Sequence, residues 1–267
     1  MPGAYYQRPL PEPPCIDFLG QRGREVFEEA LRNGGMECFF PLVAQFRTQD
    51  EPAFCGLGTL VMVLNALRVD PGKSWKGVWR WYDEQALSCC KDTAIVEREG
   101  VTLDEFVCLA RCNALTAQAQ HVQPGSTDEG GVDAFRTAVK HAATHANAVL
   151  CASYDRQGLG QTGSGHFSPI AGYHAREDLV LILDVARFKY PPHWVSLSVL
   201  HAAMQAQDAS TGRPRGWVTL ARADATSEPT EAHRCCAAGD TSDEMNEKAH
   251  ATLMRVTDGQ VAHAHAL

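Results

Sequence analysis

The longest apolar run in the chain, Leu57–Leu67, predicts a buried helix, because it is too long and too apolar for a helix that faces solvent. Pro52 lies just before this run and suits the first turn of a helix, where its missing N–H costs nothing. Cys55 then lies at the start of the helix, where unpaired N–H groups and the helix dipole lower the pKa of a thiol. This position favours a nucleophilic cysteine. The alternative is a small buried residue, the commoner role of a cysteine in an apolar helix.

The periodicity of apolar residues changes along the chain from helical to extended. Four further segments have helical patterns: Gly23–Arg32, Asp83–Cys90, Leu103–Ala110 and Val132–His145. Four later segments are rich in apolar and aromatic residues and are separated by Gly, Pro and charged turns, as expected for strands: Ala148–Tyr154, His166–Tyr173, Leu179–Val185 and Gly216–Ala221. Helices followed by strands predict an α+β fold, with a helical half packed on an antiparallel sheet.

Three segments fall outside this pattern. Trp75–Tyr82 contains three tryptophans, which we expect to pack in the core. Met1–Pro14 contains five prolines and no continuous apolar stretch, so we interpret it as an extended arm and not as a signal peptide. From Ala223 onward the chain has few large apolar residues. We therefore predict one domain over residues 1–222 and a weakly ordered tail over residues 223–267.

Composition and charge exclude two classes of function. With 45% hydrophobic residues in 267, the chain can bury a substantial core. A formal net charge of −8 without a cluster of Lys and Arg argues against nucleic-acid binding, which needs basic side chains for the phosphates. The run Leu57–Leu67 is much shorter than the roughly 20 residues that span a membrane. The sequence therefore predicts a soluble protein that binds neither nucleic acid nor membrane.

The ten cysteines are spread over a long chain that has no Asn-x-Ser/Thr glycosylation site, so we expect reduced thiols and a cytoplasmic location. Cys89 and Cys90 are adjacent, and Cys108 and Cys112 are spaced for one face of a helix. These four thiols are candidate ligands for a soft metal ion, although they match no zinc motif. The alternative is that most of them are incidental buried thiols.

A nucleophilic thiol needs a base, and His166 is the best candidate, because small residues surround it just before a predicted strand. Asp184 ends the next apolar strand, where a carboxylate without a partner would be costly to bury. We therefore expect it to orient His166. The order Cys, His, Asp matches papain-like enzymes. Gln49 precedes the cysteine and is a candidate oxyanion donor through its side-chain amide.

Three blocks of the sequence closely resemble phytochelatin synthases: Gln49–Leu57, Thr162–Ile170 and Leu181–Val195. The similarity runs from Leu10 to about Arg222. This resemblance implies a papain-like fold and an acyltransferase, glutathione γ-glutamylcysteinyltransferase. Such an enzyme releases glycine from glutathione and passes the γ-Glu-Cys unit to another glutathione or to a growing phytochelatin, for heavy-metal detoxification.

The resemblance also implies roles for individual residues. It assigns Cys55, His166 and Asp184 as the catalytic triad and Gln49 as the oxyanion donor. It places two further residues, Asp208 and Arg215, in the pocket for the γ-Glu end of the donor, where Asp accepts from the ammonium and Arg grips the carboxylate. For the anionic metal-thiolate acceptor we expect two basic side chains, Arg156 and Lys189.

No organic cofactor is expected. A heavy-metal ion such as Cd(II) or Zn(II) is expected as an activator or as part of the metal–glutathione substrate, with glutathione and its metal thiolates as partners. The oligomeric state is left open, a homodimer included. Eukaryotic members of the family usually continue into a cysteine-rich second domain, which the residues after Arg222 do not resemble. Two alternatives therefore stay open: a papain-like hydrolase of glutathione or its conjugates, and a thiol-rich metal-binding protein.

Overall fold

The computed structural model describes residues 7–123 and 129–223, so the predicted tail lies almost wholly outside the described residues. The helices are α1 (Gln21–Arg32), α2 (Phe39–Val43), α3 (Cys55–Ala66), α4 (Thr93–Glu99), α5 (Leu103–Cys112), α6 (Glu129–Ala143) and α7 (Leu197–Met204), with short 3-10 helices η1 (Glu84–Ala86) and η2 (Arg156–Leu159). The strands are β1 (Cys15–Asp17), β2 (Leu115–His121), β3 (Ala148–Asp155), β4 (Gly165–His174), β5 (Leu179–Ile182), β6 (His193–Ser196) and β7 (Gly216–Arg222).

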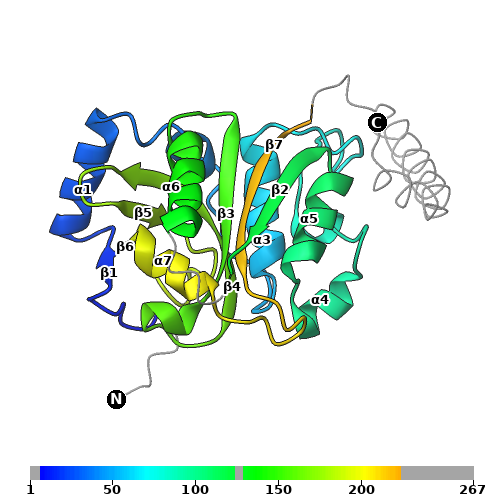
Figure 1. The fold of residues 1–267 in the computed structure, drawn as a ribbon. Helices are drawn as coiled ribbons and strands as arrows, with labels where there is room; N and C mark the ends of the chain where they lie inside the picture. The colour runs from blue at the N-terminus through cyan, green and yellow to red at the C-terminus, as the bar shows by residue number, and fades with distance from the viewer. Residues whose placement is uncertain (1–6, 124–128, 224–267) are drawn as a thin grey trace, which may run out of the picture. The chain divides into compact units, whose positions relative to one another are not determined.

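The strands form one antiparallel sheet of seven, in the order β1-β6-β5-β4-β3-β7-β2. Helices cover both faces, α3 and α5 on one and α6 and α7 on the other (Figure 1). The central strands are therefore buried on both sides, and alternate residues of β3 enter different cores. Val149 and Cys151 pack with α3, while Leu150 and Ala152 pack with α6 and α7. The predicted α+β fold with an antiparallel sheet is confirmed.

Helix α3 is the buried helix that its sequence predicted. Every residue from Gly56 to Leu64 is buried, because the helix lies between β4 of the sheet and α5. Cys55 is its first residue. Pro52 lies in the turn before the helix and not in its first turn, which corrects that expectation.

Several local expectations were wrong. The segment Asp83–Cys90 forms only the short helix η1. The tryptophans of Trp75–Tyr82 are partly exposed, Trp79 to 71%, because the segment turns back on itself at the surface through a bridge between Lys76 and Trp79. Strand β2 was not predicted, since its polar residues give little apolar signal and its pairing with β7 decides its conformation.

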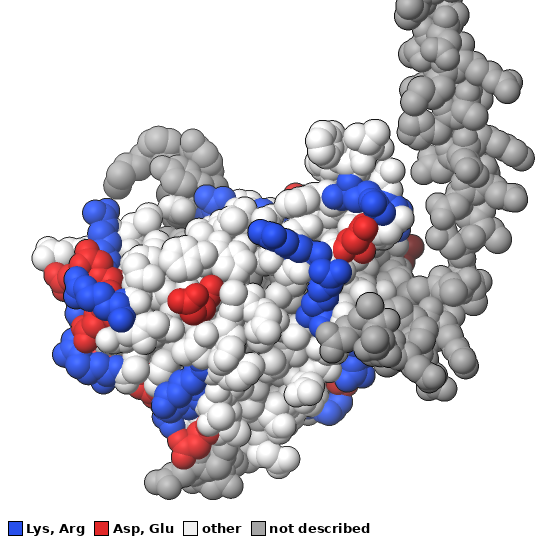
Figure 2. Space-filling model, turned by 90° about the horizontal axis from the view of Figure 1, so that it is seen from above, with Lys and Arg blue, Asp and Glu red and all other residues white. Residues whose placement is uncertain are grey.

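The surface agrees with the charge argument. Figure 2 shows one face, on which basic and acidic side chains are interspersed among neutral residues and do not gather into one basic patch. None of the helices within the described ranges is long and apolar enough to cross a membrane.

Candidate active site

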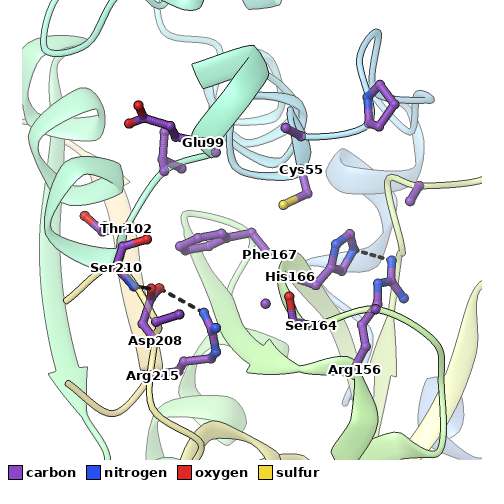
Figure 3. A pocket seen from close by; sticks show the side chains of 18 of the residues that line it. Cys55, Glu99, Thr102, Arg156, Ser164, His166, Phe167, Asp208, Ser210 and Arg215 are labelled. Atoms are coloured by element: carbon purple, nitrogen blue, oxygen red, sulfur yellow. Dashed lines mark hydrogen bonds and ion pairs between the residues drawn. The ribbon is translucent and has the colours of Figure 1, made fainter. Parts of the chain in front are cut away.

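Cys55, His166 and Asp184 come together from three separate elements. Cys55 begins α3, His166 lies near the start of β4, and Asp184 follows the end of β5. His166 Nε2 lies 2.8 Å from Oδ1 of Asp184, and the Cys55 sulfur interacts with the same imidazole by hydrogen bonding and charge. Figure 3 shows Cys55 and His166 facing the same pocket. Antiparallel pairing of β4 with β5 brings the His and the Asp together, as the sequence predicted.

The protonation of this cluster favours a thiolate–imidazolium pair. Burial raises the pKa of the Cys55 thiol, but the charge and hydrogen bond of His166, together with the backbone of Phe167 and the charge of Arg156, outweigh this effect and lower the pKa below its usual value. Burial lowers the pKa of His166, whereas the charges of Asp184 and Cys55 raise it, and the net direction is upward. Cys38, which has no such neighbours, shows the contrast, since burial raises its pKa to about 12.

Arg156, which we predicted to bind the acceptor, is instead in direct contact with Asp184. Its Nη1 lies 2.8 Å from Oδ2 and its Nη2 donates to Oδ1 at 3.0 Å. Asp184 is fully buried. Burial raises the pKa of its carboxyl, but His166 and Arg156 overcome this effect and hold the pKa far below its usual range. Arg156 lines the pocket, but its guanidinium is paired within the protein.

Gln49, the expected oxyanion donor, is buried beside the first turn of α3. Its Nε2 donates to the carbonyls of Glu51 and Pro52, at 2.8 and 2.9 Å. These bonds hold the turn that leads into Cys55, and they use both amide protons. The backbone N–H groups at the start of α3 have no such partners within the helix, because a helix leaves its first N–H groups unpaired.

The two residues expected to bind the γ-Glu end form a pair on the other side of His166 from Arg156 (Figure 3). Arg215 Nη1 donates to Oδ2 of Asp208 at 3.0 Å, and the backbone N–H of Ser210 donates to Oδ1 at 2.9 Å. Arg215 is only 8% exposed, and its Nε is buried without a hydrogen-bond partner. A buried guanidinium with a spare donor fits an incoming carboxylate.

A cavity of about 840 Å³ lies over Cys55 and is lined also by Arg156, His166, Asp208, Ser210 and Arg215, whereas Gln49 and Asp184 do not line it. Lys189 also lines this cavity and is half-buried. Its Nζ donates to the carbonyl of Thr162 at 2.6 Å and lies, like the Arg156 side chain, beside Gly163. One wall of the cavity was not predicted from the sequence. It is formed by α4, the start of α5 and the loops before and between them: Lys91, Arg98, Glu99, Gly100, Thr102 and Glu105. The capping-box pattern of Thr102 and Glu105 could have predicted the start of α5 from the sequence. It could not have predicted that these residues line a pocket.

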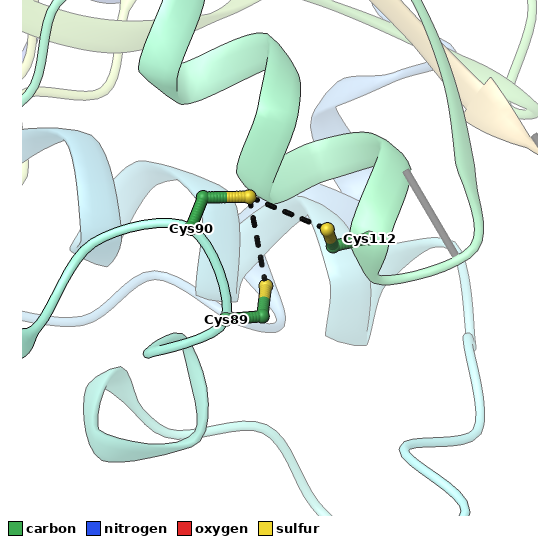
Figure 4. Close-up of side chains that lie close together, drawn as sticks. All are labelled: Cys89, Cys90 and Cys112. Atoms are coloured by element: carbon green, nitrogen blue, oxygen red, sulfur yellow. Dashed lines mark hydrogen bonds between the residues drawn. The ribbon is translucent and has the colours of Figure 1, made fainter. Parts of the chain in front are cut away.

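Three of the four candidate metal-binding cysteines, Cys89, Cys90 and Cys112, lie close together (Figure 4). Cys90 forms a disulfide with Cys108, and its sulfur lies 3.3 Å from that of Cys112 and 3.9 Å from that of Cys89. The disulfide corrects the expectation that all cysteines are reduced thiols. It forms because α5 places Cys108 against the loop that carries Cys90, with their Cα atoms 6.3 Å apart. The other adjacent pair, Cys235 and Cys236, lies outside the described residues.

The antiparallel α+β fold, with a cysteine at the start of a buried helix and a His–Asp pair on the sheet, defines the papain-like class. The family model for phytochelatin synthase matches residues 5–217, and the chain belongs to the phytochelatin synthase family.

Curated relatives agree with this assignment. The chain is 49% identical over 217 residues to glutathione gamma-glutamylcysteinyltransferase 1 of Lotus japonicus, which covers 81% of this chain and 42% of the relative. It is 50% identical to glutathione gamma-glutamylcysteinyltransferase 2 of Arabidopsis thaliana, over 81% of this chain and 47% of the relative. It is 48% identical to the glutathione gamma-glutamylcysteinyltransferase of Schizosaccharomyces pombe, over 81% and 51%. The chain spans about half the length of the curated relatives it matches.

Proposed function

We propose that this chain is a glutathione γ-glutamylcysteinyltransferase that makes phytochelatins through a thioester on Cys55. The observation that carries the proposal is a cavity lined by a cysteine of lowered pKa, by His166, which Asp184 orients from behind, and, to one side, by the buried Arg215 with its partner Asp208. The first three groups supply acyl-transfer chemistry. The pair supplies opposite charges for the free α-carboxylate and α-ammonium of a γ-glutamyl group, which ordinary peptides lack inside a chain.

In the acylation step, the Cys55 thiolate attacks the carbonyl carbon between Cys and Gly of glutathione. Negative charge on the carbonyl oxygen is stabilised by backbone N–H groups at the start of α3. Gln49 serves as a donor only if it exchanges a bond to a loop carbonyl; otherwise it positions the turn before Cys55. His166 gives its proton to the glycine nitrogen, the C–N bond breaks, and glycine leaves with a thioester on Cys55.

In the transfer step, the α-amine of a second glutathione loses a proton to His166 and attacks the thioester. The new amide bond extends the chain by one γ-Glu-Cys unit and frees Cys55. Lys189 is the proposed cation for this acceptor, because it lines the cavity near Arg156, which lies across His166 from the Arg215–Asp208 pair (Figure 3). When Cd(II) or another heavy metal blocks the acceptor thiol, the metal arrives as part of the substrate. Water in place of the amine would give γ-Glu-Cys.

The test is product analysis by mass spectrometry after incubation with glutathione, with and without Cd(II). Oligomers of γ-Glu-Cys ending in glycine are expected, and Cys55→Ser is expected to form neither oligomers nor γ-Glu-Cys. If γ-Glu-Cys and glycine are the sole products, the chain is a hydrolase and the transferase proposal fails. If no cleavage occurs and metal binds, the chain acts as a metal-binding protein.

We further propose that the cysteine cluster binds Cd(II) or Zn(II) when its disulfide is reduced. The sulfurs of Cys89, Cys90 and Cys112 lie within 4.8 Å of one another, and reduction would add the thiol of Cys108. Soft thiolates suit these ions, whereas a disulfide sulfur is a poor ligand. In a Cys55→Ser background, Cd(II)–thiolate absorption is expected after reduction and should fall when Cys112→Ser is added. Equal absorption with and without Cys112 would contradict this site. The cytoplasmic location and the homodimer stay predictions.

A further inference from the structure

Arg156 is in direct contact with both members of the His166–Asp184 pair. It begins η2 and is 3% exposed. Both of its terminal nitrogens face Asp184, at 2.8 and 3.0 Å, and Nη2 also lies 2.9 Å from Nε2 of His166. Its guanidinium lies over the ring of Tyr190, 5.3 Å from the centroid. The side chain is therefore enclosed by groups of the protein on several sides.

A second set of contacts holds Arg156 from behind. Its Nη1 donates to Oε1 of Gln161 at 2.6 Å. The amide of Gln161 is itself oriented, because its Nε2 lies 3.2 Å from Nε2 of His193, whose Nδ1 lies 2.9 Å from the carbonyl of Pro191. With Nδ1 donating to that carbonyl, Nε2 of His193 accepts from the Gln161 amide, and Oε1 is left to face Arg156. Gln161, which His193 orients in turn, thus holds the guanidinium against Asp184.

From these contacts we infer that Arg156 is a positioning residue for the proposed triad and not a ligand of the acceptor. It neutralises Asp184, so that His166 is oriented by a carboxylate whose charge is largely cancelled. If Arg156 turned to bind an anionic acceptor, the buried carboxylate of Asp184 would keep His166 at Oδ1 but lose the cation that faces its Oδ2, which is strongly unfavourable. The role of Arg156 in turnover rests on the proposed function. Its electrostatic effect on Cys55 and His166 does not, because that effect exists without substrate.

The charged and titratable groups around His166 give this role its direction. Cys55 on α3 and Asp184 after β5 are the anions that stabilise the imidazolium, and Arg156 on η2 is the cation that opposes it. Tyr154 of β3 lies edge-on to the ring, 5.7 Å between centroids, and burial raises the pKa of its hydroxyl, so it stays neutral. Without Arg156 the imidazolium would hold its proton too tightly to give it to the leaving glycine amine.

The test is the pH dependence of Cys55 alkylation by iodoacetamide, which needs neither glutathione nor turnover. In Arg156→Gln both limbs of the profile are expected to move to higher pH, by about one unit, because an opposing positive charge close to both groups is lost. Arg156→Lys keeps the charge and should stay close to the parent profile. Arg187→Gln is the matched control: Arg187 is exposed, its guanidinium lies over Phe46 and not beside Asp184, and its profile should not move.

The double variant Arg156→Gln with Asp184→Asn guards against loss of folding in the single variant. It removes both buried charges together, so its alkylation profile should return toward that of the parent. Single-turnover glycine release at pH 7 should fall about tenfold or more in Arg156→Gln at saturating glutathione. An unchanged alkylation profile, combined with a higher acceptor concentration needed for transfer, would overturn the inference and return Arg156 to the acceptor site. Failure of phytochelatin formation in the parent chain would leave the alkylation result unaffected.

Discussion

Gly165 lies directly against the guanidinium of Arg215. A Cβ atom at Gly165 would stand 2.5 Å from Nη1 and 2.7 Å from both Cζ and Nη2 of Arg215. The absence of a side chain beside His166 is therefore what lets Arg215 reach the cavity floor while it bonds Asp208. Gly165 precedes the proposed base, His166, in the chain and faces the guanidinium of Arg215, so it connects the base with the Arg215–Asp208 pair.

Gly165→Ala is expected to displace Arg215 and weaken donor binding, while the Cys55–His166 pair stays intact. The Michaelis constant for glutathione in glycine release should rise roughly tenfold or more, and the rate of Cys55 alkylation should not change. Gly20→Ala, far along the chain at the start of α1, is the control, since its Cβ would meet nothing closer than 3.3 Å. Unaltered donor binding in Gly165→Ala would show that Arg215 does not hold the donor.

Arg215→Ala and Lys189→Ala should separate the two half-reactions. Loss of a hydrogen bond to a charged group costs about 1.5–3 kcal/mol, so Arg215→Ala should slow acylation by roughly ten- to a hundredfold. Lys189→Ala should spare acylation and impair transfer. Single-turnover glycine release is measured separately from phytochelatin formation. Normal acylation in Arg215→Ala, or equal loss of both steps in Lys189→Ala, would refute the respective assignment.

The lowered pKa of Cys55 predicts selective reactivity at neutral pH. Because its pKa lies below the usual thiol value of 9.0, Cys55 should carry a larger share of thiolate at pH 7 than an ordinary cysteine, and this share should fall as the pH is lowered. Cys38, with a pKa raised to about 12, should not react in the folded protein. Peptide mapping after brief iodoacetamide treatment at pH 7 should find Cys55 labelled first among the described thiols outside the Cys89–Cys112 cluster. Preferential labelling of Cys38 would contradict this assignment.

Glu84 should make the stability of the fold depend on pH. Its side chain is fully buried, its Oε2 accepts the N–H of Asp50, its Oε1 has no partner, and burial raises its pKa from 4.5 to about 8. The folded state therefore binds this proton more tightly than the unfolded chain. The stability it contributes is complete below pH 4.5 and is lost as the pH rises toward 8.

Denaturant unfolding between pH 5.5 and 7.5 checks this expectation. The parent chain should lose at most about 1.4 kcal/mol per pH unit through Glu84, the slope for one proton. Glu84→Gln should remove that part of the slope, because an amide keeps an acceptor for Asp50 without titrating. Glu37→Gln, at an exposed carboxyl, is the control and should leave the slope as it is. A parent-like slope in Glu84→Gln would rule out Glu84 as its source.

Local patterns in the sequence were sufficient for the scaffold of the site. The apolar run after Cys55 predicted the buried helix, and the apolar strands around His166 and before Asp184 predicted a His–Asp contact across neighbouring strands. These predictions depend on the periodicity of apolar residues, on the effect of a helix start on a thiol and on the cost of burying a carboxylate without a partner. Each of these effects is set by a short segment of the chain, so each could be inferred from the sequence.

Tertiary contacts decided what the charged and sulfur-containing side chains do. Arg156 was expected to bind a substrate. It follows β3, and Asp184 follows β5, so the sheet brings the two together and the guanidinium pairs with the Asp184 carboxylate. Cys90 and Cys108 are bonded because α5 happens to pack against a loop. Gln49 donates to its own turn. A long polar side chain can reach many partners from one position, so its partner depends on which groups the fold places within about 3 Å of its tip, and sequence spacing does not contain that information.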